Sequence, residues 1–348
     1  MNHDCKLTVN ACMRSILKRT VTVGAIFLLI IGLFPMDNRS QSNDSSADST
    51  LSKILIPASA TMQQAWDLPR NPLTDSLPEN KYLAERVKLG YRLFTETRRY
   101  APRFTGNDMT CNNCHPNAGQ REKFLPLVGV AGVFPEYSKR AGRMTSLEDR
   151  IVGCFERSLN SAGMKDVHTP RPESKEVLAL SAYIAWLSEK IPAGTSPPWR
   201  GQNVIPKEKL IPIEELNPGT GKNLFLERCS NCHGENGQGV EIGDKKAGPL
   251  WGQRSWNDGA GAARTYTLAG IIRYAMPYLD PGNVTDEEAQ QIAAYITSKQ
   301  RPIFPFKKND YLKERIPIDA VYYKQLYMKN PLMENHKPKK THDTGRSG

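Results

Sequence analysis

The sequence predicts an all-α protein built from two similar helical domains in tandem, joined by a long linker that wraps from one domain to the other. Each domain opens with a helix that contains Gly-x-x-x-Phe, at Gly90 in the first and at Gly221 in the second. Each closes with an amphipathic helical pattern around a central tyrosine, over residues 177–187 and 289–296. Because the same order of features recurs at a domain-sized spacing, it indicates duplication of a whole module.

The closing helix of the second domain has the clearest start signal. Thr285 is a good N-cap residue, and Asp286 and Glu287 follow it in the first turn, where acidic side chains are favoured. Between the domains, residues 191–212 are rich in proline and glycine, which favours a linker. After Pro302 the chain carries several tyrosines, and we expect this segment to pack back on the domains.

The composition fits two domains of ordinary size with tails. The chain has 348 residues, 39% of them hydrophobic, and a formal net charge of +11. The lysines and arginines are spread along the chain instead of gathering on one element, which counts against a nucleic-acid-binding protein. A positive protein attracts small anions and acidic partners through faster encounter, so an anionic substrate or an acidic partner stays open.

The N-terminal segment predicts export. Four basic residues precede an apolar run at 21–34, which is the pattern of a signal peptide. The run is short for a membrane-spanning helix, which needs about 20 apolar residues. We therefore expect residues 1–36 to be a signal peptide or an N-terminal membrane anchor, and the protein to lie in the periplasm. That anchor would be its only contact with a membrane.

Two Cys-x-x-Cys-His motifs, one in each domain, carry the strongest chemical signal. Two cysteines three apart followed by His form the attachment signature of c-type haem: the thiols reach two vinyl groups of one porphyrin, and the His binds the iron. A zinc site made from two Cys-x-x-Cys pairs is the alternative, and it leaves both histidines without a role. We predict two covalently bound haem c groups. The attachment cysteines are Cys111, Cys114, Cys229 and Cys232, and the proximal iron ligands are His115 and His233.

The order of helix, haem motif, loops and closing helix resembles the cytochrome c fold in both domains. In that family, a glycine of the first helix lets it pack tightly against an aromatic residue of the last. The resemblance implies that Gly90 packs against Tyr183 and that Gly221 packs against Tyr295.

The sixth iron ligands are indicated less directly. Met276 is followed by Pro277 just before the last helix, which resembles the distal loop of His/Met cytochromes c. Ligation by a thioether raises the reduction potential of a haem. A core methionine is the alternative for Met276. In the first domain, the candidate ligands are Met144, Cys154, Met164 and His168.

Two stretches of the first domain resemble one dihaem family closely. Residues 146–160 read S-L-E-D-R-I-V-G-C-F-E-R-S-L-N, and Gly-Asn-Asp-Met-Thr at 106–110 precedes the first haem motif. They resemble thiosulfate dehydrogenase, which joins thiosulfate into tetrathionate, and the resemblance covers about residues 80–300. Some members carry Gly-Ala-Gly-Lys, whose lysine is an exchangeable ligand of the second haem. This chain has Ala262 at that lysine position, so the resemblance does not imply such an exchange here.

The resemblance also implies roles for individual residues. It implies that Cys154 is the axial ligand of the first haem and that Met276 is that of the second. Two active-site arginines and a serine fall on Arg140, Arg150 and Ser158. The spacing of Arg150, Cys154 and Ser158 places all three on one face of a helix.

The chemistry of these residue types agrees with the implied site. Thiosulfate is a small dianion, and joining two of them brings like charges together. Guanidinium groups suit this task because they are always charged and can fork onto paired oxygens. A thiolate beside an arginine is stabilised and nucleophilic. Without the resemblance, Arg140 and Arg150 would be interpreted as partners of haem propionates or as surface ion pairs.

The predicted activity is the oxidation of two thiosulfate to tetrathionate, with electrons leaving through the second haem to an external acceptor such as a small cytochrome c. The reverse reaction, tetrathionate reduction, stays open. One alternative is an electron-transfer cytochrome without a substrate, for which Cys154 and the arginines are dispensable. The other is a dihaem peroxidase, for which His168 is the available acid–base residue.

These features divide the chain into six segments. They are a signal peptide or anchor at 1–36, a polar linker or extended arm at 37–80, a catalytic cytochrome c domain with the first haem at 81–192, a linker at 193–213, an electron-transfer cytochrome c domain with the second haem at 214–302, and a C-terminal extension with a basic tail at 303–348.

Overall fold

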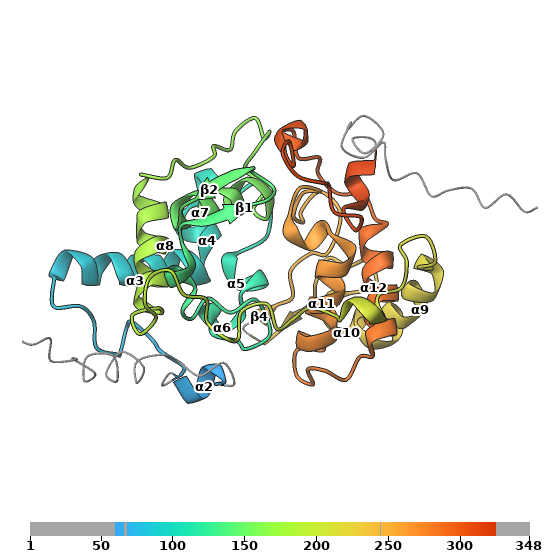
Figure 1. Ribbon diagram of the computed structural model, residues 1–348, viewed down its shortest axis with the longest axis horizontal. Helices are drawn as coiled ribbons and strands as arrows, with labels where there is room; N and C mark the ends of the chain where they lie inside the picture. The colour runs from blue at the N-terminus through green and yellow to red at the C-terminus, as the bar shows by residue number, and fades with distance from the viewer. Residues whose placement is uncertain (1–59, 66–67, 244, 325–348) are drawn as a thin grey trace, which may run out of the picture. The chain divides into compact units, whose positions relative to one another are not determined.

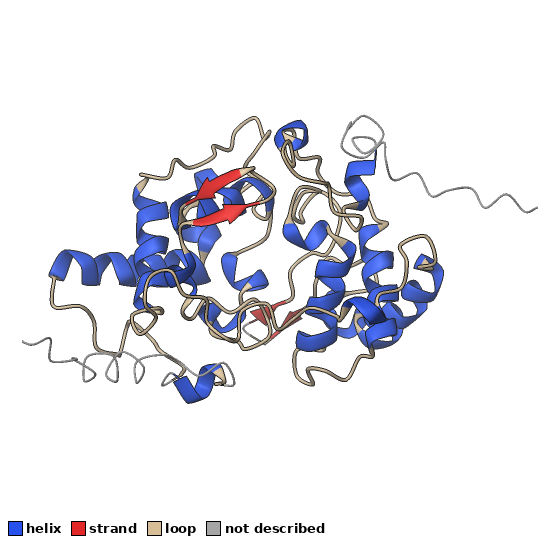
Figure 2. Ribbon diagram, viewed as in Figure 1, coloured by secondary structure: helices blue, strands red, loops and turns tan. Residues whose placement is uncertain are grey.

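The computed structural model describes residues 60–65, 68–243 and 245–324. Helices and the loops between them make up most of these residues (Figure 1, Figure 2). The signal peptide or anchor predicted at 1–36 lies outside the described residues, as do most of the arm predicted at 37–80 and the end of the basic tail. Within the described ranges, no helix is both long enough and apolar enough to cross a membrane.

The first half of the described chain is organised around two packed helices, α3 and α8 (Figure 1). Its α-helices are α2 (Met62–Ala65), α3 (Lys81–Thr95), α4 (Thr97–Tyr100), α5 (Cys111–Cys114), α6 (Pro116–Gly119), α7 (Leu147–Arg157) and α8 (Lys175–Trp186). Short 3-10 helices lie at η1 (Pro102–Phe104) and η2 (Val130–Val133). The predicted closing helix at 177–187 is therefore α8. Helix α7 also packs against α8, which fixes the helix that carries the candidate catalytic residues.

The second half repeats this arrangement, with α12 packed against both α9 and α11. Its helices are η3 (Lys207–Lys209), α9 (Pro218–Arg228), α10 (Ser230–His233), η4 (Gly261–Ala263), α11 (Thr265–Ala275), α12 (Asp286–Thr297), η5 (Lys307–Asn309) and η6 (Val321–Tyr323). The predicted closing helix at 289–296 lies within α12.

Two glycines make the same close helix crossing in the two halves. A Cβ on Gly90 would lie 2.0 Å from a carbonyl oxygen of α8 and 2.7 Å from the Cβ of Tyr183. A Cβ on Gly221 would lie 1.9 Å from a carbonyl oxygen of α12 and 2.9 Å from the Cβ of Tyr295. Since no real side chain tolerates such distances, only glycine allows these helices to approach so closely. Both predicted pairs are confirmed.

Polar side chains cap the N-termini of α12 and α9 in the second half. The hydroxyl of Thr285 accepts a hydrogen bond from the N–H of Glu288 at 3.2 Å, and the Glu288 carboxylate accepts one from the N–H of Thr285 at 2.9 Å. This reciprocal capping box satisfies two N–H groups that the helix itself cannot pair, and it confirms Thr285 as the N-cap. At α9, the side chain of Asn217 accepts from the N–H groups of Gly219 and Thr220.

Two short antiparallel strand pairs depart from the all-α prediction. Strand β1 (Glu136–Ser138) pairs with β2 (Arg143–Thr145), and β3 (Glu241–Ile242) pairs with β4 (Lys245–Lys246). The β1–β2 turn closes at Gly142, whose φ of 64° is left-handed and costs glycine nothing. Strands this short give no alternating pattern that a sequence could reveal.

The segment after Pro302 packs back on the helical halves through residue 324, as predicted. Tyr311 and Tyr323 are buried and meet edge to face, with their ring centroids 6.0 Å apart. The Lys307 ammonium donates a hydrogen bond at 2.6 Å to the buried carboxylate of Asp258 in the second half. This segment therefore belongs to the folded core and not to a free tail.

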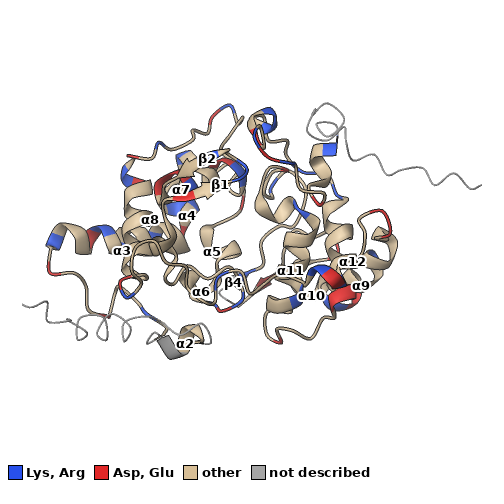
Figure 3. Cartoon of the chain, viewed as in Figure 1, with Lys and Arg blue, Asp and Glu red and all other residues tan. Residues whose placement is uncertain are grey.

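Charged residues of both signs are mixed over the described helices and loops (Figure 3). On the second half, for example, Arg273 bonds Asp286 at 2.6 Å and Arg228 bonds Glu288 at 2.9 Å. Because such pairs place acidic side chains beside basic ones, the described residues form no large surface of positive charge alone (Figure 3).

Candidate functional site

The first Cys-x-x-Cys-His motif forms the short helix α5 followed by His115. Cys111 and Cys114 are half-buried, and both thiols are free. The Nδ1 of His115 lies 2.5 Å from the carbonyl oxygen of Leu125, to which its N–H donates. Burial lowers the pKa of His115 to about 4, so the ring is neutral at pH 7. A neutral imidazole held through Nδ1 keeps its Nε2 available as an iron ligand.

The backbone around this hydrogen bond is held in an uncommon conformation. Lys123 and Leu125 have φ values of 59° and 48°, in the left-handed region that L residues rarely adopt. Such strain collects at functional sites, where the surrounding structure holds it in place. Here the strained residue Leu125 supplies the carbonyl that orients His115.

The second motif follows the same plan. Cys229 is half-buried at the N-cap of α10, Cys232 is exposed, and both thiols are free. Burial lowers the pKa of His233, and the nearby carbonyl of Gly248 partly offsets this. Each half therefore presents two free thiols beside a neutral imidazole.

A matching backbone hydrogen bond follows each motif. The N–H of Leu127 donates to the carbonyl of Gly119 at 2.7 Å, and that of Leu250 donates to the carbonyl of Gly237 at 2.7 Å. A proline precedes each of these leucines. The residue before that proline, Leu125 in the first half and Gly248 in the second, places its carbonyl beside the motif histidine. The duplication inferred from the sequence thus extends to the loops around the histidines.

The arrangement of the cysteines fits haem better than zinc. Among the described residues, no three His, Cys, Asp or Glu side chains gather where they could hold a metal ion together. The two Cys-x-x-Cys pairs therefore do not form a joint four-ligand zinc site. Each separate motif has the two thiols and the adjacent imidazole that one c-type haem needs.

Helix α7 brings Arg150 and Cys154 into direct contact. The hydroxyl of Ser146 accepts from the N–H of Asp149 at 3.0 Å, and the Asp149 carboxylate accepts in return from the N–H of Ser146 at 3.3 Å. This capping box starts the helix. One turn apart on the helix, Arg150 donates through Nη1 to the Sγ of Cys154 at 3.1 Å. The predicted shared face is therefore confirmed for this pair.

Cys154 lies close to the first haem motif. The pKa of Cys111 and that of Cys114 are raised to about 12, chiefly by burial and in part by the nearby Cys154. Arg150 lowers the pKa of Cys114 and that of His115. Charge effects of this kind require proximity, because they weaken with distance and with intervening water. The Arg150–Cys154 pair thus faces the motif that would hold the first haem.

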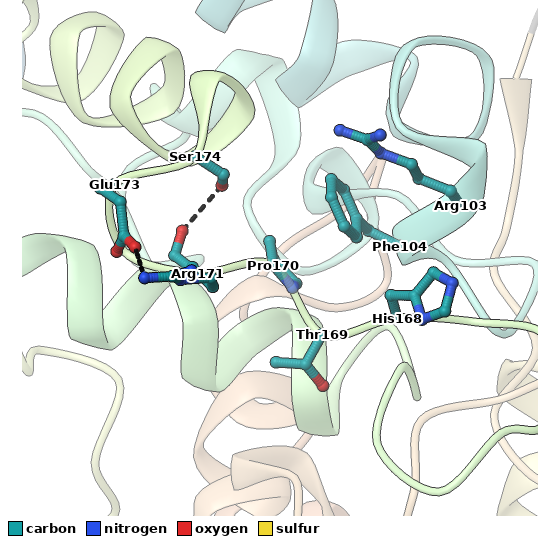
Figure 4. Close-up of a pocket in the computed structure, with 8 residues that line it drawn as sticks. All are labelled: Arg103, Phe104, His168, Thr169, Pro170, Arg171, Glu173 and Ser174. Atoms are coloured by element: carbon teal, nitrogen blue, oxygen red, sulfur yellow. Dashed lines mark hydrogen bonds and ion pairs between the residues drawn. The ribbon is translucent and has the colours of Figure 1, made fainter. Parts of the chain in front are cut away.

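The other candidate ligands of the first haem are exposed. Met144, on β2, is 54% exposed, and Met164 is 44% exposed. His168 lies in an open surface pocket of about 400 Å³, together with Arg103 and Phe104 (Figure 4). Of the four candidates, Cys154 is the one whose charge acts on both cysteines of the first motif. The acid–base residue that a peroxidase would need, His168, is at the surface.

Buried amides from both halves fix the C-terminal end of α7. The N–H of Ser158, the C-cap residue, donates to the carbonyl of Cys154 at 2.8 Å. The side-chain amide of Asn107 donates to the carbonyl of Ser158 at 2.8 Å. Asn257, fully buried in the second half, donates to a carbonyl in the last turn of α7 at 2.8 Å. Carbonyls at a helix end have no partner within the helix, so these amides hold the position of Ser158.

Arg140 is held in the β1–β2 turn from two sides. Its Nε donates to the hydroxyl of Tyr311 at 3.2 Å, and its Nη1 donates to the carbonyl of Gly259. Its own carbonyl accepts from the N–H of Tyr311 at 2.8 Å. Tyr311 has a φ of 58°, so this clamp also rests on a strained residue.

A neighbouring arginine is neutralised. Arg157, in the last turn of α7, donates two hydrogen bonds to the carboxylate of Asp310, at 2.9 and 2.8 Å. Its Nη1 also lies 3.5 Å from the carbonyl oxygen of Gly259, the group that Arg140 bonds. Asp310 therefore cancels the charge of Arg157, whereas the described contacts of Arg140 are with a hydroxyl and a carbonyl.

The structure joins some of the predicted site residues and leaves others apart. Arg150 contacts Cys154, but none of the contacts among described residues joins Arg140 to Cys154. The sequence did not reveal the partners of Arg140 and of the α7 end, which come from distant segments. Among the residues that sequence reasoning missed, Asn107 and Arg157 gave a signal, since each lies inside a stretch that carries the family resemblance.

Met276 occupies the C-cap of α11 and is half-buried. Its N–H donates to the carbonyl of Ile272 at 3.2 Å, which closes the helix. Its side chain packs against a small buried cluster of Phe124, Ile271 and Ala275, and Leu125 packs against the same cluster. The predicted second-haem ligand and the residue that orients His115 thus share one cluster.

Comparisons with family models identify both halves. Residues 99–193 match the model described as SoxA/TsdA, cytochrome c domain. Residues 217–296 match the model described as cytochrome c oxidase, cbb3-type, subunit III. The two tandem halves are therefore both cytochrome c domains.

Curated relatives and a solved structure that are 36% identical to this chain are named thiosulfate dehydrogenase. The thiosulfate dehydrogenase of Psychrobacter arcticus is 36% identical over 251 residues, which cover 72% of this chain and 73% of that protein. The thiosulfate dehydrogenase of Allochromatium vinosum is 36% identical over 239 residues, covering 67% of this chain and 84% of that protein. A solved structure, the thiosulfate dehydrogenase TsdBA of Marichromatium purpuratum in its as-isolated form, is 36% identical with a TM-score of 0.61. The match covers 68% of this chain and spans only 50% of that solved chain. Because the curated relatives are this similar over most of their length, the chain belongs to the thiosulfate dehydrogenase family.

Proposed function

We propose that the protein oxidises thiosulfate to tetrathionate at a site on the face of α7. Two thiosulfate dianions each lose one electron, and a sulfur–sulfur bond forms between them. The observation that carries this proposal is the contact between Arg150 and Cys154, 3.1 Å apart, beside the first Cys-x-x-Cys-His motif. The curated relatives named as thiosulfate dehydrogenases support the choice of substrate.

In this proposal the two arginines bind the anions. Arg150 holds the substrate sulfur next to Cys154, and Arg140 offsets the repulsion between two dianions, since the described contacts bring it no carboxylate. Ser158, held at the helix end by the Asn107 amide, donates a hydrogen bond from its hydroxyl to a substrate oxygen. Electrostatic stabilisation of this kind acts most strongly where water is excluded.

Two covalent haem c groups complete the site. Cys111 and Cys114 would attach the first, with His115 and Cys154 as its iron ligands. The second would be attached through the second motif. Its residues would be Cys229 and Cys232 for attachment and His233 and Met276 for the iron. When bound, the haems supply the one-electron redox chemistry and pass the electrons through the second haem to an external acceptor.

Contacts between the two halves support exit through the second haem. Leu125, whose carbonyl accepts from His115, packs in one cluster with Met276. Next to this cluster, the guanidinium of Arg121 lies 3.9 Å from the ring centroid of Tyr278. The loop after the first motif therefore packs directly on the loop that carries the proposed ligand of the second haem.

The remaining assignments complete the proposal. The acceptor is a small cytochrome c or another redox protein, and the protein works in the periplasm, exported by its segment 1–36, which is cleaved or stays as an anchor. The catalytic domain spans 81–192, the electron-transfer domain spans 214–302, and residues 193–213 link them. The proline- and glycine-rich sequence of the linker and the matched ranges 99–193 and 217–296 support these bounds.

The test pairs turnover with spectroscopy on purified holoprotein. Cys154→Ala should abolish thiosulfate oxidation while both haems stay attached, because other cysteines attach them, and the low-spin signal of the first haem should change. Arg150→Gln should lower kcat/KM about tenfold to a hundredfold, the equivalent of a charge-assisted hydrogen bond of about 1.5–3 kcal/mol. Arg103→Gln is the control, since it removes an exposed arginine of the same domain that pairs with Glu176.

The same measurements separate the alternatives. An electron-transfer cytochrome without a substrate would show no haem reduction by thiosulfate, and Cys154→Ala would then change nothing in turnover. A peroxidase would consume hydrogen peroxide and depend on His168. If the Cys154→Ala protein oxidises thiosulfate at the parent rate with unchanged haem spectra, the proposed site is wrong.

A further inference from the structure

Two buried hydrogen-bond donors lie close together without hydrogen-bond partners among the described residues. They are the indole Nε1 of Trp256 and the Nη1 of Arg301. Trp256 is 4% exposed and Arg301 is 6% exposed. The guanidinium carbon of Arg301 lies 4.9 Å from the ring centroid of Trp256, so both donors belong to one place. Buried donors are rarely left unpaired, because each one loses its hydrogen bonds to water.

The charge of Arg301 is also uncompensated. Its Nε donates to the hydroxyl of Tyr322 at 2.8 Å, and its Nη2 donates to the carbonyls of Leu250 and Ile296, each at 3.1 Å. None of these acceptors is a carboxylate. Burial lowers the pKa of Arg301, which reflects the cost of keeping its charge away from water.

The nearest carboxylate is already engaged. Asp258 contributes some attraction to Arg301, but its two oxygens accept from the N–H of Phe304 at 2.7 Å and from the ammonium of Lys307 at 2.6 Å. A buried cation needs a partner that brings both charge and hydrogen-bond acceptors. The donors of Arg301 and Trp256 together fit an anionic oxygen group.

Both residues pack against the apolar surroundings of the haem motifs. Trp256 belongs to the core against which Cys111 and Cys114 pack. Leu250, whose carbonyl accepts from Arg301, packs against that core and also against the core on which Cys229 packs. The two donors are thus connected through direct contacts to the cores on which both haem motifs pack.

We infer that Trp256 Nε1 and Arg301 Nη1 donate hydrogen bonds to the carboxylate of a haem propionate. A c-type haem carries propionates, and a propionate inside a protein needs a cation and a donor to stay ionised. The pair would satisfy both residues and compensate the charge of Arg301. The inference rests on the proposed attachment of haem and not on the proposed substrate.

The test measures reduction potentials, since these respond to the charge beside a propionate. Holoprotein carrying Arg301→Gln is compared with the parent in a redox titration monitored by electron paramagnetic resonance, which resolves the two ferric haems. Loss of the positive charge should lower the potential of one haem, because the ferric state gains relative stability. That haem's potential should also become more dependent on pH, as its propionate is no longer held ionised. The haem that responds is the one whose propionate is bound.

A second variant keeps the test decisive if Arg301→Gln fails to fold, since Arg301 also ties two backbone carbonyls together. Trp256→Phe removes only the indole donor and keeps an aromatic ring, and it should lower the potential of one haem by a smaller amount. Arg273→Gln is the matched control: it removes the same charge from the same half, where Asp286 pairs it at 2.6 Å. Both potentials should stay at the parent values in this control.

Three results would overturn the inference. The first is a Trp256→Phe protein that holds two haems with both potentials and their pH dependence unchanged. The second is a loss of thiosulfate affinity without any change in potential, which would assign the donors to the substrate. The third is an equal shift in the Arg273→Gln control. A parent protein that binds no haem would instead refute the proposed function, and a mass measurement reveals this before any variant is made.

Discussion

Removing the hydroxyl of Tyr311 tests whether the C-terminal segment prepares Arg140 for anion binding. In Tyr311→Phe, the backbone hydrogen bond of 2.8 Å to Arg140 is kept, but the acceptor 3.2 Å from Arg140 Nε is lost. A hydrogen bond to a charged group contributes about 1.5–3 kcal/mol, and the long distance favours the lower figure. If that energy keeps the guanidinium in place, KM for thiosulfate should rise about tenfold while kcat changes little.

Steady-state kinetics with thiosulfate and an artificial electron acceptor measure both constants. Tyr266→Phe is the matched control: its hydroxyl donates to the carbonyl of Ile211 at 2.7 Å, in the second half and without contact to an arginine. In urea unfolding, Tyr266→Phe should lose about 1 kcal/mol of stability and Tyr311→Phe about 1.5 kcal/mol, because only the latter removes a hydrogen bond to a charged group. If Tyr311→Phe loses that stability but keeps the parent KM, then Tyr311 supports the fold and the proposed orientation of Arg140 is refuted.

Two further predictions concern stability. Gly90→Ala should destabilise the protein by about 3 kcal/mol or more, because its Cβ would lie 2.0 Å from a backbone oxygen. Gly153→Ala is the control: a Cβ there meets nothing within 4 Å, so this variant should be stabilised by about 0.5–1 kcal/mol. Equal stability changes of the two variants in urea unfolding would contradict the close crossing of α3 and α8. A hydrogen bond from Arg143 holds the pKa of Asp149 below its usual 3.8. The ionised Asp149 therefore stabilises the fold at a pH above 3.8, and this stabilisation is lost as the pH falls through the lowered pKa of the folded protein. Asp149→Asn should lower the stability by under about 1 kcal/mol at pH 7, because the Arg143–Asp149 pair is partly exposed. The stability difference between variant and parent should shrink in acid. A difference independent of pH would show that the charge of Asp149 is irrelevant.

The sequence contained the local and repeated parts of the fold. Thr285 and Glu288 lie three positions apart, so their capping box could be predicted without any tertiary structure. Gly90 and Tyr183 are far apart in the chain, yet their pairing could be predicted because both domains resemble the cytochrome c fold, in which such a pair packs together. Arg150 and Cys154 lie on one helix turn, and helical spacing alone brought them together.

The parts that could not be predicted depend on contacts between distant segments. Arg140 sits in a hairpin whose strands are too short to give a pattern, and its clamp, Tyr311, lies 171 positions along the chain. The Asn257 amide that fixes the end of α7 comes from the other half. Such contacts follow from packing, which no local propensity encodes. The family resemblance indicated Arg140 as a candidate site residue but gave no account of what holds it.

The contacts around Gly259 argue that the second half does more than receive electrons. Its carbonyl accepts from Arg140 and lies within reach of Arg157, while Asn257, two positions earlier, bonds the end of α7. The helix with Cys154 and the arginine proposed to bind anions are therefore both held by one loop of the second half. A first half produced alone would leave the last carbonyls of α7 without these partners and Arg140 without its acceptor. The proposed anion binding at the first site would thus depend on the second half through direct hydrogen bonds, in addition to the proposed transfer of electrons.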